Sequence, residues 1–332
     1  MTNLKETDKD LLSELDRLGD LLARAKAEIS NVVFGQDLVI QNALCALLGG
    51  GHALLVGVPG LAKTRLVETI ARVLGLDEKR IQFTPDLMPA DILGSEVLET
   101  SADGSRAFRF IRGPVFTQLL MADEINRASP RTQSALLQAM QEKQVTIAGM
   151  RQTLPEPFHV LATQNPLEQE GTYPLPEAQL DRFFMEIDVG YPDLAAERRM
   201  LFATTGGKDD LPQQVLGPED LMQAQALVRR MPVGDHVVNA ILKLVRSARP
   251  ELSGAGAASQ HLSWGPGPRA SQAFMLAIRA KCLLEGRHAP SVEDVATLAH
   301  PVLKHRMALT FAARADGVTT REVIARLCEN LD

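Results

Sequence analysis

The sequence predicts an α/β fold with a parallel β-sheet, followed by an all-helical domain. Short apolar runs, such as residues 53–56 and 119–122, lead into glycine-rich or acidic segments, as strands buried in a parallel sheet do. Beyond residue 190 the pattern changes to helical spacing. The chain has 332 residues, of which 45% are apolar, and this is enough for two domains with hydrophobic cores.

We expect three segments, in the order 1–32, 33–190 and 191–332. Leucines at helical spacing within residues 8–31 predict an amphipathic helix that packs on the α/β domain. The α/β domain ends near residues 190–192, after a last strand at 184–189. A loop rich in Gly, Ala and Ser is expected at 252–267. Helices of the third segment are expected near residues 193–203, 218–230, 234–248, 268–285, 291–304 and 319–330.

The strongest local signal is the loop that follows the run 53–56. Small residues let its backbone N–H groups point inward, and the next helix presents its positive end to a phosphate. We expect Lys63 to reach the β- and γ-phosphates of ATP and the Thr64 hydroxyl to hold Mg²⁺. Ala62 stands where the usual pattern has glycine, and it is tolerable if its φ is negative. The loop comprises Gly57, Val58, Pro59, Gly60, Leu61, Ala62, Lys63 and Thr64.

Two more apolar runs end in polar groups. Asp123 and Glu124 follow the run 119–122. We expect Asp123 to be the Mg²⁺ partner and Glu124 to orient and deprotonate the attacking water. The run 158–163 leads to Asn165, which can hydrogen-bond the water or the γ-phosphate, although alone it would indicate only a turn. Together, the three motifs predict ATP binding and hydrolysis.

The chain resembles the MoxR group of AAA+ ATPases from about Val33 to its C-terminus. The resemblance implies an AAA+ P-loop NTPase core with a helical lid, and it places the segment beginning at Val33 beside the adenine. Lys63 and Thr64 match Walker A, Asp123 and Glu124 match Walker B, and Asn165 matches sensor 1. The strings that carry the resemblance are residues 57–64, 123–127, 162–166 and 175–183.

The resemblance also assigns roles to arginines. Arg182 matches the arginine finger that an AAA+ subunit inserts into its neighbour's site, where a guanidinium stabilises charge in the transition state. Arg269 matches sensor 2, which reaches the γ-phosphate from the lid. Arg127 and Arg131 are further candidates to face a neighbour. Without the resemblance, we would expect Arg182 to be a surface arginine in a salt bridge.

Two insertions interrupt the α/β pattern. The first, at residues 96–110, is expected to form a hairpin or a distorted loop with an Asp-Gly turn, and it matches the family's insert within the second helix. The second, at residues 144–154 with a turn at 148–151, matches the pre-sensor-1 hairpin. In related rings such elements line the central pore or face the client, which makes Met150 and Arg151 candidate contacts. Packing between subunits is the alternative.

Composition and charge exclude other classes of protein. We expect neither a signal peptide nor a membrane span, because no apolar stretch is long enough. The three cysteines lack metal-ligand spacing, which predicts reduced thiols and a cytoplasmic location. Residues 1–190 carry more Asp and Glu than Lys and Arg, which argues against a nucleic-acid-binding face.

The sequence thus predicts an ATP hydrolase that acts as a homo-oligomeric ring, by resemblance a hexamer. The family implies chaperone-like remodelling of a protein client, or insertion of its cofactor, beside a partner with a von Willebrand factor A domain. A chelatase-like motor subunit or a nucleic-acid translocase shares the same motifs. A nucleotide-gated switch with little turnover is a third hypothesis, against which intact Glu124 and Arg182 argue.

Overall fold

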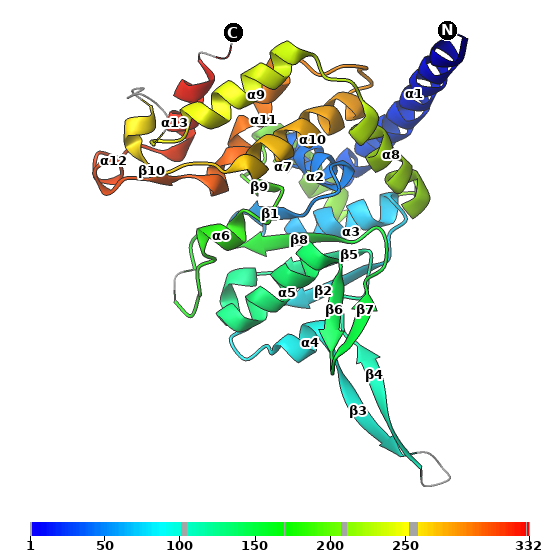
Figure 1. The fold of residues 1–332 in the computed structure, drawn as a ribbon. Coiled ribbons are helices and arrows are strands. Elements are labelled where there is room, and N and C mark those ends of the chain that lie inside the picture. The colour runs from blue at the N-terminus through cyan, green and yellow to red at the C-terminus, as the bar shows by residue number, and fades with distance from the viewer. Residues whose placement is uncertain are drawn as a thin grey trace.

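A five-stranded sheet forms the centre of the α/β domain in the computed structural model (Figure 1). All its neighbouring strands run parallel, so their carboxyl ends lie at one edge. The structure describes residues 2–100, 105–168, 170–206, 211–251, 258–329 and 331. In spatial order the strands are β2 (Glu78–Gln82), β5 (Leu119–Asp123), β8 (His159–Gln164), β1 (Ala53–Val56) and β9 (Met185–Asp188).

Side chains alternate between two hydrophobic clusters on the two faces of this sheet, as the period of a strand requires. Leu55 and Leu161 belong to the cluster that contains α2 and α3. Leu54 and Leu120 belong to the cluster that contains α5. Burial of both faces explains why β1, β5 and β8 read as apolar runs, whereas the edge strand β2 is polar and partly exposed. The helices of this domain are α2 (Asp37–Leu48), α3 (Lys63–Val73), α4 (Pro89–Leu93), η1 (Ile125–Arg127), α5 (Pro130–Glu142) and α6 (Glu177–Leu180).

The C-terminal domain is helical, and its helices lie where the sequence predicts them, except for a short helix at Phe311–Ala315 that is not predicted. Local signals explain this agreement, because Ser291 and Thr319 form capping boxes with Asp294 and Glu322 at two of the helix starts. The helices are α7 (Leu194–Thr205), α8 (Pro218–Arg230), α9 (Asp235–Ser247), α10 (Pro268–Leu284), α11 (Val292–Leu303), α12 (Phe311–Ala315) and α13 (Thr320–Cys328).

The helical domain also contains a short antiparallel ribbon that the sequence does not predict. It joins β10 (Leu262–Trp264) to β11 (Ala308–Leu309) and lies beside the short turns η2 (Ser259–His261) and η3 (Lys304–Arg306). Strands of two or three residues are too short to show a period. Residues 252–257 of the expected loop at 252–267 lie outside the described residues, and residues 259–264 form η2 and β10 instead of a loop.

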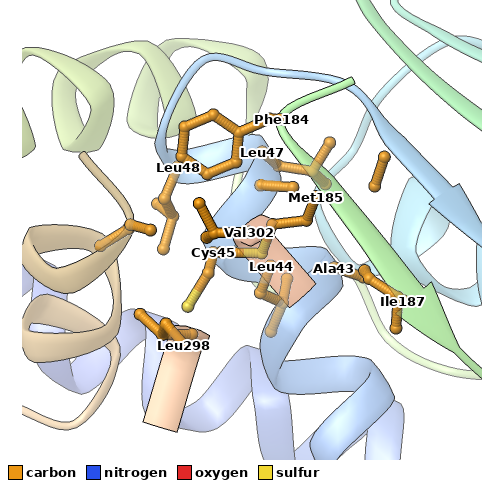
Figure 2. Close-up of a cluster of buried hydrophobic side chains, with 14 of the residues drawn as sticks. Ala43, Leu44, Cys45, Leu47, Leu48, Phe184, Met185, Ile187, Leu298 and Val302 are labelled. Carbon is orange, nitrogen blue, oxygen red and sulfur yellow. The ribbon is translucent and has the colours of Figure 1, made fainter. Parts of the chain in front are cut away.

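Helices α1 and α2 join the two domains. α1 (Thr2–Ser30) packs against α2 and α3 as well as against α8 and α10, so it contacts both domains rather than the α/β domain alone. Figure 2 shows α2 side chains between Met185 and Ile187 of β9 and Leu298 and Val302 of α11. The domain boundaries therefore stay a prediction. Across the described residues, no helix has the length and apolar character that a membrane span needs.

Both insertions form antiparallel hairpins. The pair β3 (Gly94–Thr100) and β4 (Arg106–Arg112) projects away from the sheet, and the pair β6 (Gln144–Ile147) and β7 (Met150–Thr153) lies near it (Figure 1). The turn of the first hairpin lies outside the described residues. In the second, Ala148 and Gly149 have φ of 47° and 82°, which makes a two-residue turn. Met150 and Arg151 therefore belong to the returning strand instead of the turn.

The packing of α1 gives a prediction about stability. Leu22 is fully buried between the domains, so we expect Leu22→Ala to lower the free energy of unfolding by about 2–5 kcal/mol. Leu12→Ala on the same helix should cost less than about 1 kcal/mol, because Leu12 is 44% exposed. Urea unfolding of the two variants measures the difference. Equal losses would show that α1 does not pack as described.

Candidate active site

The predicted phosphate loop lies at the carboxyl edge of the sheet. The Gly57 N–H donates to the carbonyl of Gln164 on β8 at 3.1 Å, and the Val189 N–H donates to the carbonyl of Val56 at 2.8 Å. A Cβ on Gly57 would lie 2.5 Å from the Val189 carbonyl oxygen, so only glycine fits there. The loop then enters α3, whose first N–H groups can bind an anion.

Ala62 does not meet the condition of a negative φ. Its φ is 57° and its ψ is 24°, which places it in the left-handed region just before α3. The loop therefore keeps the backbone that glycine would adopt freely, although a methyl group in this region costs about 1–2 kcal/mol. Strain of this kind persists where the surrounding structure fixes the backbone. Here the tight fit at Gly57 and the start of α3 fix the two ends of the loop.

Lys63 joins the loop to the acidic strand ends. Its ammonium donates to the carbonyl of Gly57 and, at 3.2 Å, to that of Val58. Burial lowers the pKa of Lys63, whereas the nearby carboxylates of Asp123, Glu124 and Glu168 act to raise it. The structure thus brings the predicted Walker A lysine and both Walker B acids into one cluster of charges. Glu168 has no strand or motif around it that predicts this position.

The Thr163 hydroxyl contacts both predicted Walker B residues. It donates to Oδ1 of Asp123 at 2.6 Å and accepts a hydrogen bond from the backbone N–H of Glu124 at 2.9 Å. Arg80 on β2 pairs with Oδ2 of Asp123 at 2.5 Å. Sequence reasoning missed Thr163 and Arg80. The available signal was a polar residue within the apolar run at 158–163, next to the carboxyl end of its strand.

Glu124 is held by its side chain and by an unusual backbone. Its φ is 54°, and its Oε2 accepts from Gln82 at 2.7 Å and from Arg127 at 3.1 Å. Sequence reasoning also missed Gln82, which lies opposite Asp123 in the register of β2 with β5. Arg127 therefore contacts its own chain's Glu124, whereas Arg131 is exposed.

Asn165 lies between the loop and the acids. It follows β8, which is the strand between β5 and β1, and it is buried. Its Oδ1 accepts from the Leu167 N–H at 3.1 Å, which fixes the orientation of the amide. The predicted sensor residue is thus at the same edge as Lys63, Asp123 and Glu124.

A cavity of about 870 Å³ opens beside the phosphate loop. Its size lies within the range of small-molecule sites. The segment at Val33, which we expect beside the adenine, forms one wall, and Gln36 donates to the Gly190 carbonyl at 2.8 Å. Residues that line the cavity include Val33, Phe34, Gln36, Pro59, Leu61, Ala62, Tyr191 and Pro192.

Arg182 and Arg269 lie together at the opposite edge of the sheet. Arg182 comes three residues before Met185, which pairs with Ala53 at the start of β1. Both arginines line a cavity of about 220 Å³ with His52, and Arg269 pairs with Asp181 at 3.5 Å. Four residues of strand span roughly 13 Å between the edges. Within one chain, neither arginine is brought to the phosphate loop.

The donor set at the carboxyl edge fits Mg²⁺. The Thr64 hydroxyl and the Asp123 carboxylate are hard oxygen ligands, and Mg²⁺ commonly takes one or two such protein ligands together with phosphate oxygens and water. Both Asp123 oxygens already accept one hydrogen bond, from Thr163 and from Arg80, and each keeps a further lone pair.

Comparisons with known proteins identify the family of both domains. Residues 52–185 match the family model described as ATPase family associated with various cellular activities (AAA), and residues 254–327 match the AAA lid domain. The chain is 42% identical over 311 residues to Chaperone MoxR1 of Mycobacterium tuberculosis, covering 93% of this chain and 81% of that protein. Protein MoxR of Paracoccus denitrificans is 33% identical, covering 86% and 88%.

A solved structure shows the same fold. The crystal structure of a candidate ATPase from Cytophaga hutchinsonii superposes with a TM-score of 0.89 at 36% identity, covering 100% of this chain and 99% of that one. The α/β core with its parallel sheet and helical lid, as predicted from the sequence, is therefore confirmed.

The Thr163 contacts predict a loss of activity. We expect Thr163→Val to lower the ATPase rate by about 10- to 100-fold, because outer contacts of this kind orient a metal-binding carboxylate. Thr163→Ser keeps the hydroxyl and should keep most of the rate. Steady-state ATPase assays on both variants make the comparison. A Val variant as active as the wild type would contradict the role given to the hydroxyl.

The backbone at Ala62 predicts that an alanine-to-glycine substitution has opposite effects on stability at this position and within a helix. Ala62→Gly should raise the free energy of unfolding by about 1 kcal/mol, because glycine adopts a positive φ without strain. Ala296→Gly, at an exposed position within α11, should lower it by about 1 kcal/mol. Chemical denaturation of the two variants tests the signs. A loss at both positions would refute strain at Ala62.

Proposed function

Because the chain belongs to the MoxR family of AAA+ ATPases, we propose that it hydrolyses ATP with Mg²⁺ and uses the energy to remodel a protein client. The observation that carries this proposal is the single edge that holds Lys63, Asp123, Glu124 and Asn165. A phosphate cradle, a metal-binding acid and a base meet there beside a cavity large enough for a nucleotide.

Each residue has one chemical task in this proposal. The loop N–H groups and Lys63 bind the phosphates, and Thr64 and Asp123 hold Mg²⁺. Bound Mg²⁺ supplies positive charge that offsets the charge of the transferred phosphoryl group. Glu124 accepts the proton of the attacking water, and Asn165 orients that water or the γ-phosphate. Release of Glu124 from Gln82 and Arg127 would free its Oε2 for this step.

We assign Arg182 and Arg269 to the site of a neighbouring subunit. They lie at the edge opposite the phosphate loop, and the Arg182 guanidinium makes no hydrogen bond to a described residue. An interface that joins the carboxyl edge of one subunit to the amino edge of the next is head-to-tail, and such interfaces generate rings when they close. A hexamer is the proposed assembly. Hydrolysis then depends on assembly, because each site needs its neighbour's arginines.

The client and partner follow from the family and from the hairpins. The name of Chaperone MoxR1 describes that relative as a chaperone. Here we propose chaperone-like remodelling or cofactor insertion in the cytoplasm, beside a partner with a von Willebrand factor A domain. Phe108 is 72% exposed on the projecting β3–β4 hairpin and Met150 is 54% exposed on β7, which supports contacts with a client or a neighbour. The net charge of −6 favours a protein client over nucleic acid.

The assembly proposal predicts a concentration-dependent rate. The ATPase rate per subunit should rise with protein concentration, and Arg182→Ala should lower it by about 10³-fold or more while sparing nucleotide binding. Glu124→Gln provides the inactive control, and Arg326→Ala, on an exposed part of α13, provides an arginine control that should stay active. A flat rate together with a fully active Arg182→Ala variant would rule out the trans assignment.

A further inference from the structure

The turn η3 of the helical domain contacts β9 and the residues before it through three consecutive side chains. Lys304 pairs with Glu186 at 2.6 Å and with Asp188 at 2.5 Å. His305, which is buried, contacts the Phe183 carbonyl through Nε2 at 3.0 Å. Arg306 comes next, and it contacts the residues on both sides of Arg182. One turn of the lid thus holds the whole segment that carries the proposed arginine finger.

Arg306 makes the most extensive of these contacts. Only 2% of the residue is exposed, and all three guanidinium nitrogens donate hydrogen bonds. Nε donates to Oδ1 of Asp181 at 2.8 Å, and the terminal nitrogens donate to the carbonyls of Phe183 at 2.7 Å and Phe184 at 3.2 Å. A further bond of 2.6 Å to the Val302 carbonyl joins the guanidinium to α11. A buried charge requires this degree of pairing.

Asp181 extends the contact to the second arginine. Its Oδ1 accepts from Arg306, while its Oδ2 pairs with Arg269 at the start of α10. Arg182 lies between Asp181 and Phe183, two of the residues that Arg306 holds. The same guanidinium therefore fixes the backbone under Arg182 and the carboxylate that orients Arg269.

We propose that Arg306 is the positioning residue for both arginines, so that the lid sets whether a subunit can activate its neighbour's site. This inference rests on the proposed trans action of Arg182 and Arg269. The planar guanidinium suits the task because its donors spread over several directions, which a lysine ammonium at the end of a flexible stem does not reproduce. Catalytic groups held by such contacts lose much of their effect when they are misplaced by about 1 Å.

A mixture of two variants distinguishes a positioning role of Arg306 in trans from a general loss of structure. Arg306→Lys alone should lower kcat by about 10²-fold while the affinity for ATP stays unchanged. Glu124→Gln subunits are inactive at their own site but supply intact arginines to a neighbour. In an equal mixture, half of the subunits have an intact Glu124, and in a random head-to-tail ring half of these have a neighbour with intact arginines. The mixture should therefore regain roughly a quarter of the wild-type rate per subunit.

Further variants keep the test decisive. Asp181→Asn removes the carboxylate partner of the same ion pair, so it should lower the rate as Arg306→Lys does. It also tests the proposal if the Arg306 variant does not fold. Arg326→Lys, at an exposed position, should leave the rate unchanged. Thermal unfolding and ATP binding of each variant verify that the subunits are folded.

The mixture of Arg182→Ala with Glu124→Gln distinguishes the two proposals. If that mixture regains activity but neither the Arg306→Lys nor the Asp181→Asn mixture does, the positioning role is overturned while the trans mechanism stands. Full activity of Arg306→Lys alone overturns it as well. If Arg182→Ala is itself fully active, the proposed function in trans fails, and the role of Arg306 fails with it.

Discussion

The parallel direction of the five strands is the constraint on which the rest of the structure depends. Parallel pairing puts every carboxyl end at one edge, so the phosphate loop after β1 meets Asp123 and Asn165 without any long-range fit of side chains. The same pairing puts Arg182, which precedes β9, at the other edge. The register of Ala53 with Met185 fixes this separation through backbone hydrogen bonds. The proposed head-to-tail assembly would bring the two edges together.

The carboxyl edge is held in a conformation that costs free energy. Ala62 and Glu124 both have left-handed backbones, which a Cβ makes unfavourable. Lys63 and Glu124 are held by groups of their own chain, namely loop carbonyls, Gln82 and Arg127. Conflicts between local preference and structure are expected at functional sites, where the rest of the fold compensates for them. The two hydrophobic clusters on the faces of the sheet supply that compensation.

Local signals explain which features the sequence predicts. The phosphate loop and the acids lie directly after apolar strands, and lid helices begin at capping residues such as Ser291. A few neighbouring residues are therefore enough to predict each of these features. Thr163 and Arg80 escape prediction because strand order and register, which no local pattern records, bring them to Asp123. For Ala62, the methyl group favours a negative φ, but the constraints at both ends of the loop override that preference. The β10–β11 ribbon is too short to have a period.

Strand β9 connects the cavity beside the phosphate loop to the two arginines. Its carboxyl end leads to Tyr191, which lines the cavity, and its amino end follows Arg182. Between them, His300, Lys304 and Arg321 of the lid all contact Asp188, and the hydrogen bond from His300, together with Lys304, holds the pKa of that carboxyl well below its usual range. Asp188 therefore stays charged, and β9 stays attached to the lid. Because α2 also packs between β9 and α11 (Figure 2), apolar packing and ion pairs together attach β9 to the lid.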